Sequence, residues 1–140
     1  MKPVRVVADT NVIVSALLWE GNESKIMDLV EEGKIKLFTS LVLLDELRRV
    51  LGYARFGLEE KMVDDNVKYI LTISEIISPK CRVRLIREDL ADDKVLECAA
   101  EGKAEYIVSG DKHLLRLKKF RGIKIMPAKK LVDILVANRV

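Results

Sequence analysis

Two aspartates follow predicted strands, at positions where α/β proteins bind their ligands. Asp9 comes directly after the β-branched run of residues 4–8, and Asp111 follows the strand pattern of residues 106–109. In open parallel sheets, ligands bind beyond the carboxyl ends of the strands. Either aspartate alone is better explained as a turn residue or a helix N-cap. The presence of Asp at both strand ends favours a functional site.

A third acid, Glu46, lies at the edge of the apolar face of a predicted helix. Ser40 is a suitable N-cap for this helix, which we expect to extend to about residue 51. With a rotation of about 100° per residue, five residues form its apolar face: Leu43, Leu44, Leu47, Val50 and Leu51. Glu46 falls at the edge of that face, so its carboxylate is expected to be half-buried and to need a partner. The alternative is a surface Glu paired with Arg49 or another neighbour.

The fourth candidate acid is Asp92, near the start of a helix predicted over residues 92–100. An apolar stripe on this helix contains Val95, Leu96 and Ala99. On the helical wheel Asp92 is centred on that stripe, whereas Asp93 points about 100° away. A carboxylate on a buried face is unfavourable unless it meets a cation or hydrogen-bond donors, so the wheel favours Asp92 as the functional acid. The alternative, compatible with the first, is that Asp92 is the helix N-cap.

Three or four converging carboxylates are the ligands that hard divalent cations prefer. Mg²⁺ and Mn²⁺ take oxygen ligands, and Mg²⁺ usually keeps several waters. Such ions activate water as a nucleophile and stabilise the charge that grows on a phosphodiester. Asn11 and Ser109 are close neighbours of Asp9 and Asp111 in the sequence and could orient water or phosphate. We therefore predict a Mg²⁺ or Mn²⁺ site that hydrolyses phosphate esters.

Other common kinds of catalytic site lack their residues. The chain has one histidine, His113, and two cysteines, Cys81 and Cys98, without the Cys/His spacing of a zinc site. It has no Gly-rich phosphate loop and no nucleophile-elbow serine. Cys98 follows the helical period and is expected to be buried. The acids therefore remain the main candidates for chemistry.

Strand and helix patterns alternate along the chain. Short β-branched or alternating runs predict strands over residues 4–8, 35–39, 81–85, 106–109 and 123–126. Periodic apolar residues predict helices over residues 12–19, 23–32, 41–51, 58–73, 92–100 and 131–136. The alternation predicts an α/β fold with a mostly parallel sheet. The length of 140 residues and the absence of a linker predict a single domain over residues 1–140.

The composition indicates a folded chain with an uneven charge distribution. Hydrophobic residues make up 49% of the chain, which is enough for a sizeable core. No apolar stretch approaches the ~20 residues of a membrane span, and no signal peptide is evident, so we expect a cytoplasmic protein. The net charge is +3, yet residues 112–132 contain eight Lys/Arg and no acid. This stretch favours an anionic ligand, although a solvated lysine-rich surface is an equally good explanation.

Taken in order, the four acids and their neighbours resemble the PIN domain. The matching segments read VVADTN at residues 6–11, LLDELRRVL at 43–51, DDKVLECA at 92–99 and YIVSGD at 106–111. Each motif is weak alone, whereas four in this order are fairly specific. The resemblance covers nearly the whole chain, and it is closest to prokaryotic PIN proteins described as toxins of toxin–antitoxin pairs.

This resemblance implies a fold, an activity and a set of site residues. The fold would be a compact three-layer α/β/α sandwich, and the activity a Mg²⁺- or Mn²⁺-dependent ribonuclease. Four acids carry over as the catalytic and metal-binding set: Asp9, Glu46, Asp92 and Asp111. Asn11 and Ser109 carry over as polar support, and Asp93 stays the alternative to Asp92. The resemblance also implies homodimers and, for the toxin branch, inhibition by a small antitoxin protein.

Basic residues directly after the fourth acid could contact RNA phosphates without sequence preference. They are Lys112, His113, Arg116, Lys118 and Lys119. For His113, a place in a solvated loop or at a helix start is the simpler explanation. Phe120 is the only aromatic residue of the basic stretch, so base stacking is not expected to dominate. The alternative function is a non-catalytic, PIN-like module that binds RNA or protein.

Overall fold

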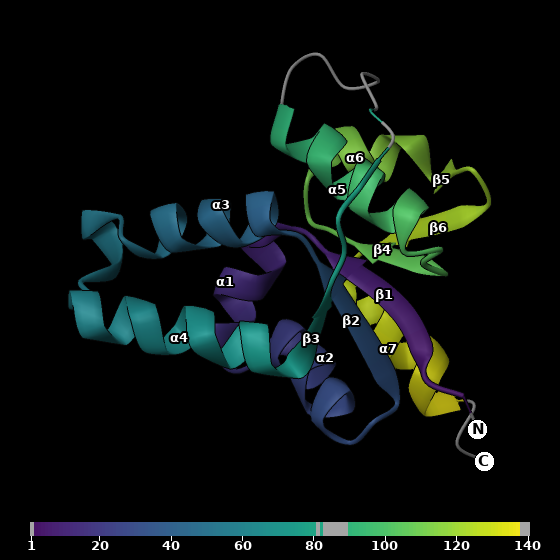
Figure 1. Cartoon of the computed structure of the whole chain (residues 1–140). Helices are drawn as coiled ribbons and strands as arrows, with labels where there is room; N and C mark the ends of the chain where they lie inside the picture. The colour runs from purple at the N-terminus through teal and green to yellow at the C-terminus, as the bar shows by residue number, and fades with distance from the viewer. Residues whose placement is uncertain (1, 81, 83–89, 138–140) are drawn as a thin grey trace.

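The computed structural model describes residues 2–80, 82 and 90–137, which form a sheet flanked by helices (Figure 1). Within these residues one sheet contains β1 (Val4–Ala8), β2 (Ile35–Thr39), β3 (Ser74–Ile76), β4 (Tyr106–Val108), β5 (Lys119–Phe120) and β6 (Ile123–Met126). The strand order is β3-β2-β1-β4-β6-β5. Every neighbouring pair is parallel except β5–β6, so the prediction of a mostly parallel sheet is confirmed.

The order of the strands creates a switch point between β1 and β4. The chain adds β2 and β3 on one side of β1, and it adds β4, β6 and β5 on the other side. The register pairs Val7 with Phe38 of β2 and Ala8 with Val108 of β4. The carboxyl ends of β1 and β4 therefore lie side by side where the winding reverses, which is the place where open α/β sheets bind ligands.

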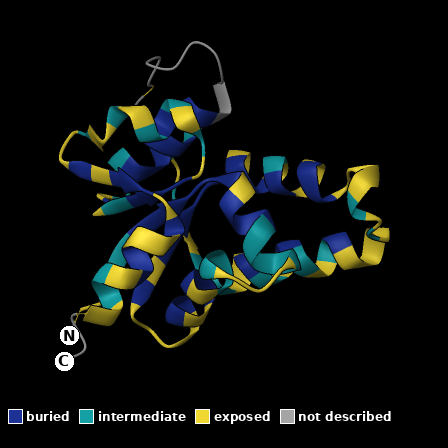
Figure 2. Cartoon of the chain, turned by 180° about the vertical axis from the view of Figure 1, so that it is seen from behind, coloured by how far each residue is buried: buried dark blue, intermediate teal, exposed yellow. Residues whose placement is uncertain are grey.

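Helices cover both faces of the sheet. They are α1 (Thr10–Leu18), α2 (Asn22–Glu31), α3 (Leu41–Leu51), α4 (Glu60–Ile73), α5 (Leu90–Glu101), α6 (Lys112–Leu117) and α7 (Ala128–Ala137). Apolar residues of α1, α2 and α7 share a core with Val6 and Leu37 on one face, whereas α5 and α6 pack around Val7 and Ile107 on the other. Figure 2 shows the strands buried between helices whose outer surfaces are exposed. The predicted three-layer α/β/α sandwich is confirmed.

Helices α3 and α4 form a hairpin that projects from the sheet (Figure 1). A short 3-10 turn, η1 (Ala54–Phe56), joins them. Their buried residues, among them Leu47 and Val67, belong to the same core as α1. This packing sets α3 beside α1, close to the carboxyl end of β1. None of the helices within the described ranges is both long and apolar enough to cross a membrane.

The predictions for Ser40 and Cys98 are confirmed by the structure. Ser40 is the N-cap of α3, since its Oγ accepts a hydrogen bond from the Leu43 N–H (3.3 Å). Gly33 follows the end of α2 with a φ of 79°, a left-handed conformation that glycine adopts without a steric penalty. Cys98 is fully buried, and this burial raises the pKa of its thiol to about 12. Cys81 lies outside the described residues.

Four short elements fall outside the predictions: η1, β3, β5 and α6. η1 and β3 have three residues each and β5 has two, without a β-branched run, and α6 has six residues, fewer than two helical turns. β3 also follows α4 without a break, so the helical pattern hides its start. The strand predicted over residues 81–85 lies outside the described residues, apart from Arg82, which belongs to no strand.

Candidate functional site

Asp9 lies at the junction between β1 and α1. Its backbone N–H donates to the Val108 carbonyl of β4 (3.0 Å). Its Oδ1 accepts a hydrogen bond from the Val12 N–H (2.9 Å), so Asp9 is the N-cap of α1, and the capping interpretation is confirmed. Asp9 is only 5% exposed. The cap therefore holds a buried carboxylate at the carboxyl end of β1.

Ser109 links the ends of β1 and β4. It is fully buried, and its Oγ donates a hydrogen bond to Oδ2 of Asp9. The same oxygen accepts a hydrogen bond from the Asp111 N–H (2.9 Å). A hydroxyl can donate and accept at once, so the two bonds are compatible. Ser109 therefore orients the Asp9 carboxylate and also fixes the turn that carries Asp111.

Asp111 begins α6 in the way that Asp9 begins α1. Its Oδ1 accepts a hydrogen bond from the His113 N–H (2.7 Å), which makes Asp111 an N-cap as expected. Asp111 and His113 are both half-buried. His113 is therefore a helix-start residue, in agreement with the simpler of its two explanations.

Glu46 reaches the same region from α3. Its side chain is 21% exposed, and its Oε2 accepts a hydrogen bond from Oγ1 of Thr10 (2.8 Å). Arg49 approaches only to 4.0 Å and is 65% exposed, so this ion pair contributes little. The prediction of a half-buried Glu46 is confirmed. Thr10, the first residue of α1, is a partner that sequence analysis missed, because the contact spans 36 positions and no local pattern signals it.

Burial raises the pKa of the Asp9 carboxyl from 3.8 to about 6. Loss of solvation is the largest cause, whereas the hydrogen bonds from Ser109 and Val12 lower this pKa by stabilising the charged form. The negative charges of Asp111 and Glu46 raise it further. These two acids therefore lie close enough to act on the charge of Asp9. A cation among the three would offset both the lost solvation and the repulsion.

Asp92 and Asp93 both lie in the first turn of α5, and both are buried, at 5% and 2% exposed. The prediction that Asp93 points away from the buried face is wrong. α5 packs against β1, β2, β4 and α3, so more than one side of the helix is covered. The interpretation of Asp92 as an N-cap is also wrong, because α5 begins two residues earlier, at Leu90. Both acids therefore remain candidates.

Most of the other predicted site residues lie on the surface. Asn11 is exposed in the first turn of α1. Four of the basic residues are exposed: Lys112, Arg116, Lys118 and Lys119. Because α6 starts at the residue after Asp111, it places the first of these basic side chains beside the acids.

The acids suit a hard cation in their chemistry but do not form a ready-made cage. Among the described residues, no three His, Cys, Asp or Glu side chains are close enough together to hold one metal ion. The available donors are carboxylate and hydroxyl oxygens with an excess of negative charge, which is the set that Mg²⁺ and Mn²⁺ prefer. The residues present therefore fit such an ion, provided that the acids draw closer together around it.

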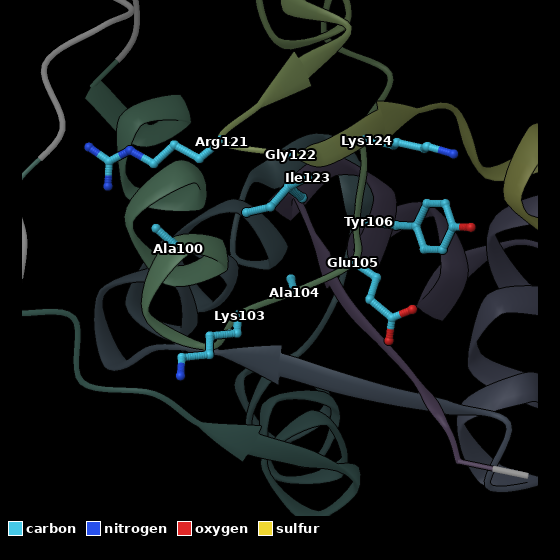
Figure 3. Close-up of a pocket in the computed structure, with 9 residues that line it drawn as sticks. All are labelled: Ala100, Lys103, Ala104, Glu105, Tyr106, Arg121, Gly122, Ile123 and Lys124. Carbon is cyan, nitrogen blue, oxygen red and sulfur yellow. The ribbon is translucent and has the colours of Figure 1, made fainter.

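A pocket of about 520 Å³ lies where β4 and β6 begin, at the end of these strands that is opposite to the acids (Figure 3). It is lined by the start of β4, at Tyr106, and by the turn between β5 and β6, at Gly122. β4 runs from this pocket toward the candidate site, so the two are at opposite ends of the strand. The long side chains of Arg121 and Lys124 extend in opposite directions. This pocket is separate from the acids.

The family model described as the PIN domain matches residues 5–113 of the chain. The chain belongs to the PIN-domain family. The matched range includes the four candidate acids, with Asp9 near its start and Asp111 near its end. The resemblance noted from the sequence is thus confirmed at the level of the family. PIN domains are generally nucleases that use divalent metals such as Mg²⁺, so the chain is a nuclease-type domain.

Two similar proteins show how far the likeness extends. An uncharacterized protein of Methanocaldococcus jannaschii, MJ1680, is 34% identical over 125 residues, which cover 82% of this chain and 76% of the relative. Among solved structures, the PIN domain of RRP44 from T. brucei matches with a TM-score of 0.54 and 12% identity. That match covers 99% of this chain and 84% of the other. At such low identity it concerns the PIN fold alone.

Proposed function

We propose that this PIN domain is a Mg²⁺- or Mn²⁺-dependent ribonuclease. Its catalytic and metal-binding acids would be Asp9, Glu46, Asp111 and one of the pair Asp92 and Asp93, with Asp92 as first choice. The observation that carries the proposal is the buried carboxylate of Asp9, held at the switch point of the sheet with two further acids acting on its charge. Such a group is unfavourable in an empty site and useful beside a cation.

Each residue of the proposed site has a distinct task. Asp9 and Asp111 would offer oxygen ligands at neighbouring strand ends, and Glu46 would offer a third from α3. Ser109 orients Asp9, and Thr10 holds the carboxylate of Glu46 in place. A bound Mg²⁺ or Mn²⁺ supplies Lewis-acid stabilisation of the phosphodiester and lowers the pKa of water.

RNA is the proposed substrate because cations follow the acids directly. Phosphate contacts from exposed side chains attract a polyanion without reading its sequence. The residues proposed for these contacts are Lys112, His113, Arg116, Lys118 and Lys119. Asn11, exposed beside Asp9, is proposed to orient water or phosphate.

The proposal is tested by cleavage of a fluorescent RNA with increasing Mg²⁺ or Mn²⁺. The wild type should cleave only with metal, and Asp9→Asn should lose activity on the order of 1,000-fold, because several kcal/mol of transition-state stabilisation depend on the ion. Asp133→Asn is a matched control, since Asp133 is an exposed acid of α7 that pairs with Lys129. It should leave cleavage unchanged, and all three proteins should melt cooperatively.

Two results would contradict this assignment. Cleavage that persists in excess chelator would exclude the metal, and full activity in Asp9→Asn would exclude this site. RNA binding without cleavage, unchanged when the acids are neutralised, would support the alternative of a non-catalytic RNA- or protein-binding module.

Three further expectations rest on the likeness to toxin-type PIN proteins or on composition. They are a homodimer, a small antitoxin protein as inhibitor, and a cytoplasmic location. Light scattering on the purified protein tests the dimer. Co-purification of a small protein expressed from the same locus tests the antitoxin.

A further inference from the structure

A groove of about 740 Å³ crosses the open edge of the sheet beside β5 and β6. It is lined by residues of α6, β6 and α7 together with the segment around β5. α6 packs on one face of the sheet and α7 on the other (Figure 1). Because residues of both helices line the groove, it runs around the edge between them. The PIN-family match ends at residue 113, before the first residue of the groove. The groove is therefore a feature outside the matched segment.

The charge of the groove has one sign. Four lysines line it: Lys118, Lys119, Lys124 and Lys130. None of the lining residues that the structure describes is acidic. All four are exposed, and none of them makes an ion pair with another residue that the structure describes. Uncompensated cations along a groove attract an anionic chain and raise its local concentration.

One end of the groove lies at the carboxyl end of β6, the strand next to β4. Met126 lines the groove at the carboxyl end of β6, and its carbonyl accepts a hydrogen bond from the Ser109 N–H (3.1 Å). The Ser109 hydroxyl in turn donates to Asp9. Two hydrogen bonds thus connect the groove lining with Asp9. Met126 also pairs with Val108 of β4, so a polymer in the groove would reach the carboxyl end of β6, beside the strand that leads to Asp111.

The lining between the lysines is aliphatic rather than polar or aromatic. Leu115, Met126 and Ile134 contribute apolar surface, and none of the lining residues that the structure describes is aromatic. Aliphatic side chains can contact the faces of unpaired bases and the sugars, whereas a duplex keeps its bases stacked and presents mainly phosphates and hydroxyls. A groove that combines cations with an apolar lining therefore suits a single strand.

We infer that this groove is the track for the single-stranded RNA that flanks the bond to be cleaved. The inference rests on the proposed ribonuclease function and assigns the strand that flanks the cleaved bond a binding surface on this chain. Binding would depend on contacts to phosphates and on apolar contacts. Its affinity should therefore fall steeply as the salt concentration rises and should depend little on the RNA sequence.

The test is anisotropy of a fluorescein-labelled single-stranded RNA, measured in chelator over a range of NaCl concentrations. The groove variant replaces Lys118, Lys119, Lys124 and Lys130 by Gln. Each lost phosphate contact lowers the slope of log affinity against log salt by ~0.7, so the slope should fall by up to ~2.8. At low salt the affinity should fall roughly 100-fold.

Matched controls separate the groove from general surface charge. A second variant replaces four exposed lysines elsewhere by Gln: Lys2, Lys25, Lys61 and Lys68. It carries the same net charge as the groove variant and should keep most of the affinity and slope. Ile134→Glu adds a negative charge to the half-buried lining of the groove, and it should also weaken single-strand binding.

The substrate class is tested by a duplex of the same sequence. The wild type should bind the single strand more tightly, and the groove variant should lose that preference. An unchanged slope in the groove variant, equal losses in the control variant, or no single-strand binding by the wild type would overturn the inference. If the groove variant kept the wild-type slope of log affinity against log salt, the groove would instead be a candidate binding surface for a protein partner.

The same proteins distinguish the two proposals from each other. Binding in the groove without metal-dependent cleavage would contradict the ribonuclease and leave the RNA track standing. Cleavage and binding that survive in the groove variant would contradict the track and leave the ribonuclease standing.

Discussion

Asp9 has a structural and a chemical role in the same side chain. As an N-cap it accepts the Val12 N–H and stabilises the start of α1. As a buried carboxylate near Asp111 and Glu46 it is electrostatically unfavourable, and its pKa rises from 3.8 to about 6. A neutral side chain of the same shape would keep the cap and remove the charge. Stability and the proposed activity therefore make opposite demands on this position.

Asp9 should make the metal-free protein less stable at neutral pH than at mildly acidic pH. Because the pKa in the folded state lies above 3.8, the folded state holds the proton more tightly than the unfolded state. The contribution of Asp9 to the free energy of unfolding therefore falls as pH rises from about 4 to 6. The full difference is roughly 3 kcal/mol, at about 1.4 kcal/mol per pKa unit.

The measurement is urea unfolding in chelator at pH 4.5 and pH 7, with Asp9→Asn as the comparison. Asn keeps an oxygen for the Val12 N–H, and Ser109 can accept from its amide. At pH 7 the variant should be more stable than the wild type, and the gain should shrink toward pH 4.5. A variant that is less stable at pH 7 would show that the charge of Asp9 is already compensated.

The candidate site was predictable only where local patterns mark it. Asp9 and Asp111 follow strands, and the half-burial of Glu46 follows from its helical face. Thr10 was missed because its partner lies on another helix, 36 positions away. The burial of Asp93 was missed because a helical wheel assumes one covered side, whereas α5 contacts both the sheet and α3. Contacts between distant segments are thus the part that sequence patterns leave out.

At the scale of elements, the carboxyl end of α5 lies very close to β2. Gly102 follows the last residue of α5, and a Cβ there would meet Cδ2 of Phe38 at 2.9 Å. It would also meet the backbone carbonyl of Cys98 at 3.2 Å, which cannot move without shifting the helix. The absence of a side chain at Gly102 therefore permits the close contact between α5 and the ring of Phe38.

Gly102→Ala should destabilise the protein by about 1–3 kcal/mol, because the added methyl overpacks this contact. Chemical unfolding measures the loss. Gly52→Ala is the matched control at the end of α3, since its Cβ would meet backbone oxygens only at 3.5 Å, an ordinary contact distance. The control should change the free energy of unfolding by less than ~0.5 kcal/mol. Equal stability of the two variants would mean that α5 shifts freely against the sheet.

The lengths of the elements decided which of them could be predicted. Helices α2, α3 and α4 have 10 to 14 residues and were placed within about two residues at each end. β5 has two residues and exists only by pairing with β6, so its own sequence carries almost no signal. α6 has six residues, and although Asp111 was noted as a possible N-cap, no periodic pattern long enough to predict a helix follows it.

At the scale of the whole molecule, the strand order brings the acids together. Asp9 and Asp111 are 102 positions apart in the sequence, and only the placement of β4 beside β1 makes their strand ends adjacent. α/β alternation predicted a parallel sheet but not its order, because several orders satisfy the same alternation. The same topology leaves β5 and β6 at an open edge, where the lysine groove forms.

Mg²⁺ should stabilise the whole fold if the acids bind it. An ion that binds only the folded state at 100 times its Kd adds about 2.7 kcal/mol to the free energy of unfolding. For a domain of 140 residues this corresponds to a rise in Tm of roughly 8 °C. Asp9→Asn should lose most of the rise, whereas Asp133→Asn and the groove variant should keep it. The rise should be smaller at pH 5 than at pH 7.5, because below its pKa of about 6 the proton competes with the ion for Asp9. Equal rises in the wild type and Asp9→Asn at both pH values would place the ion elsewhere on the molecule.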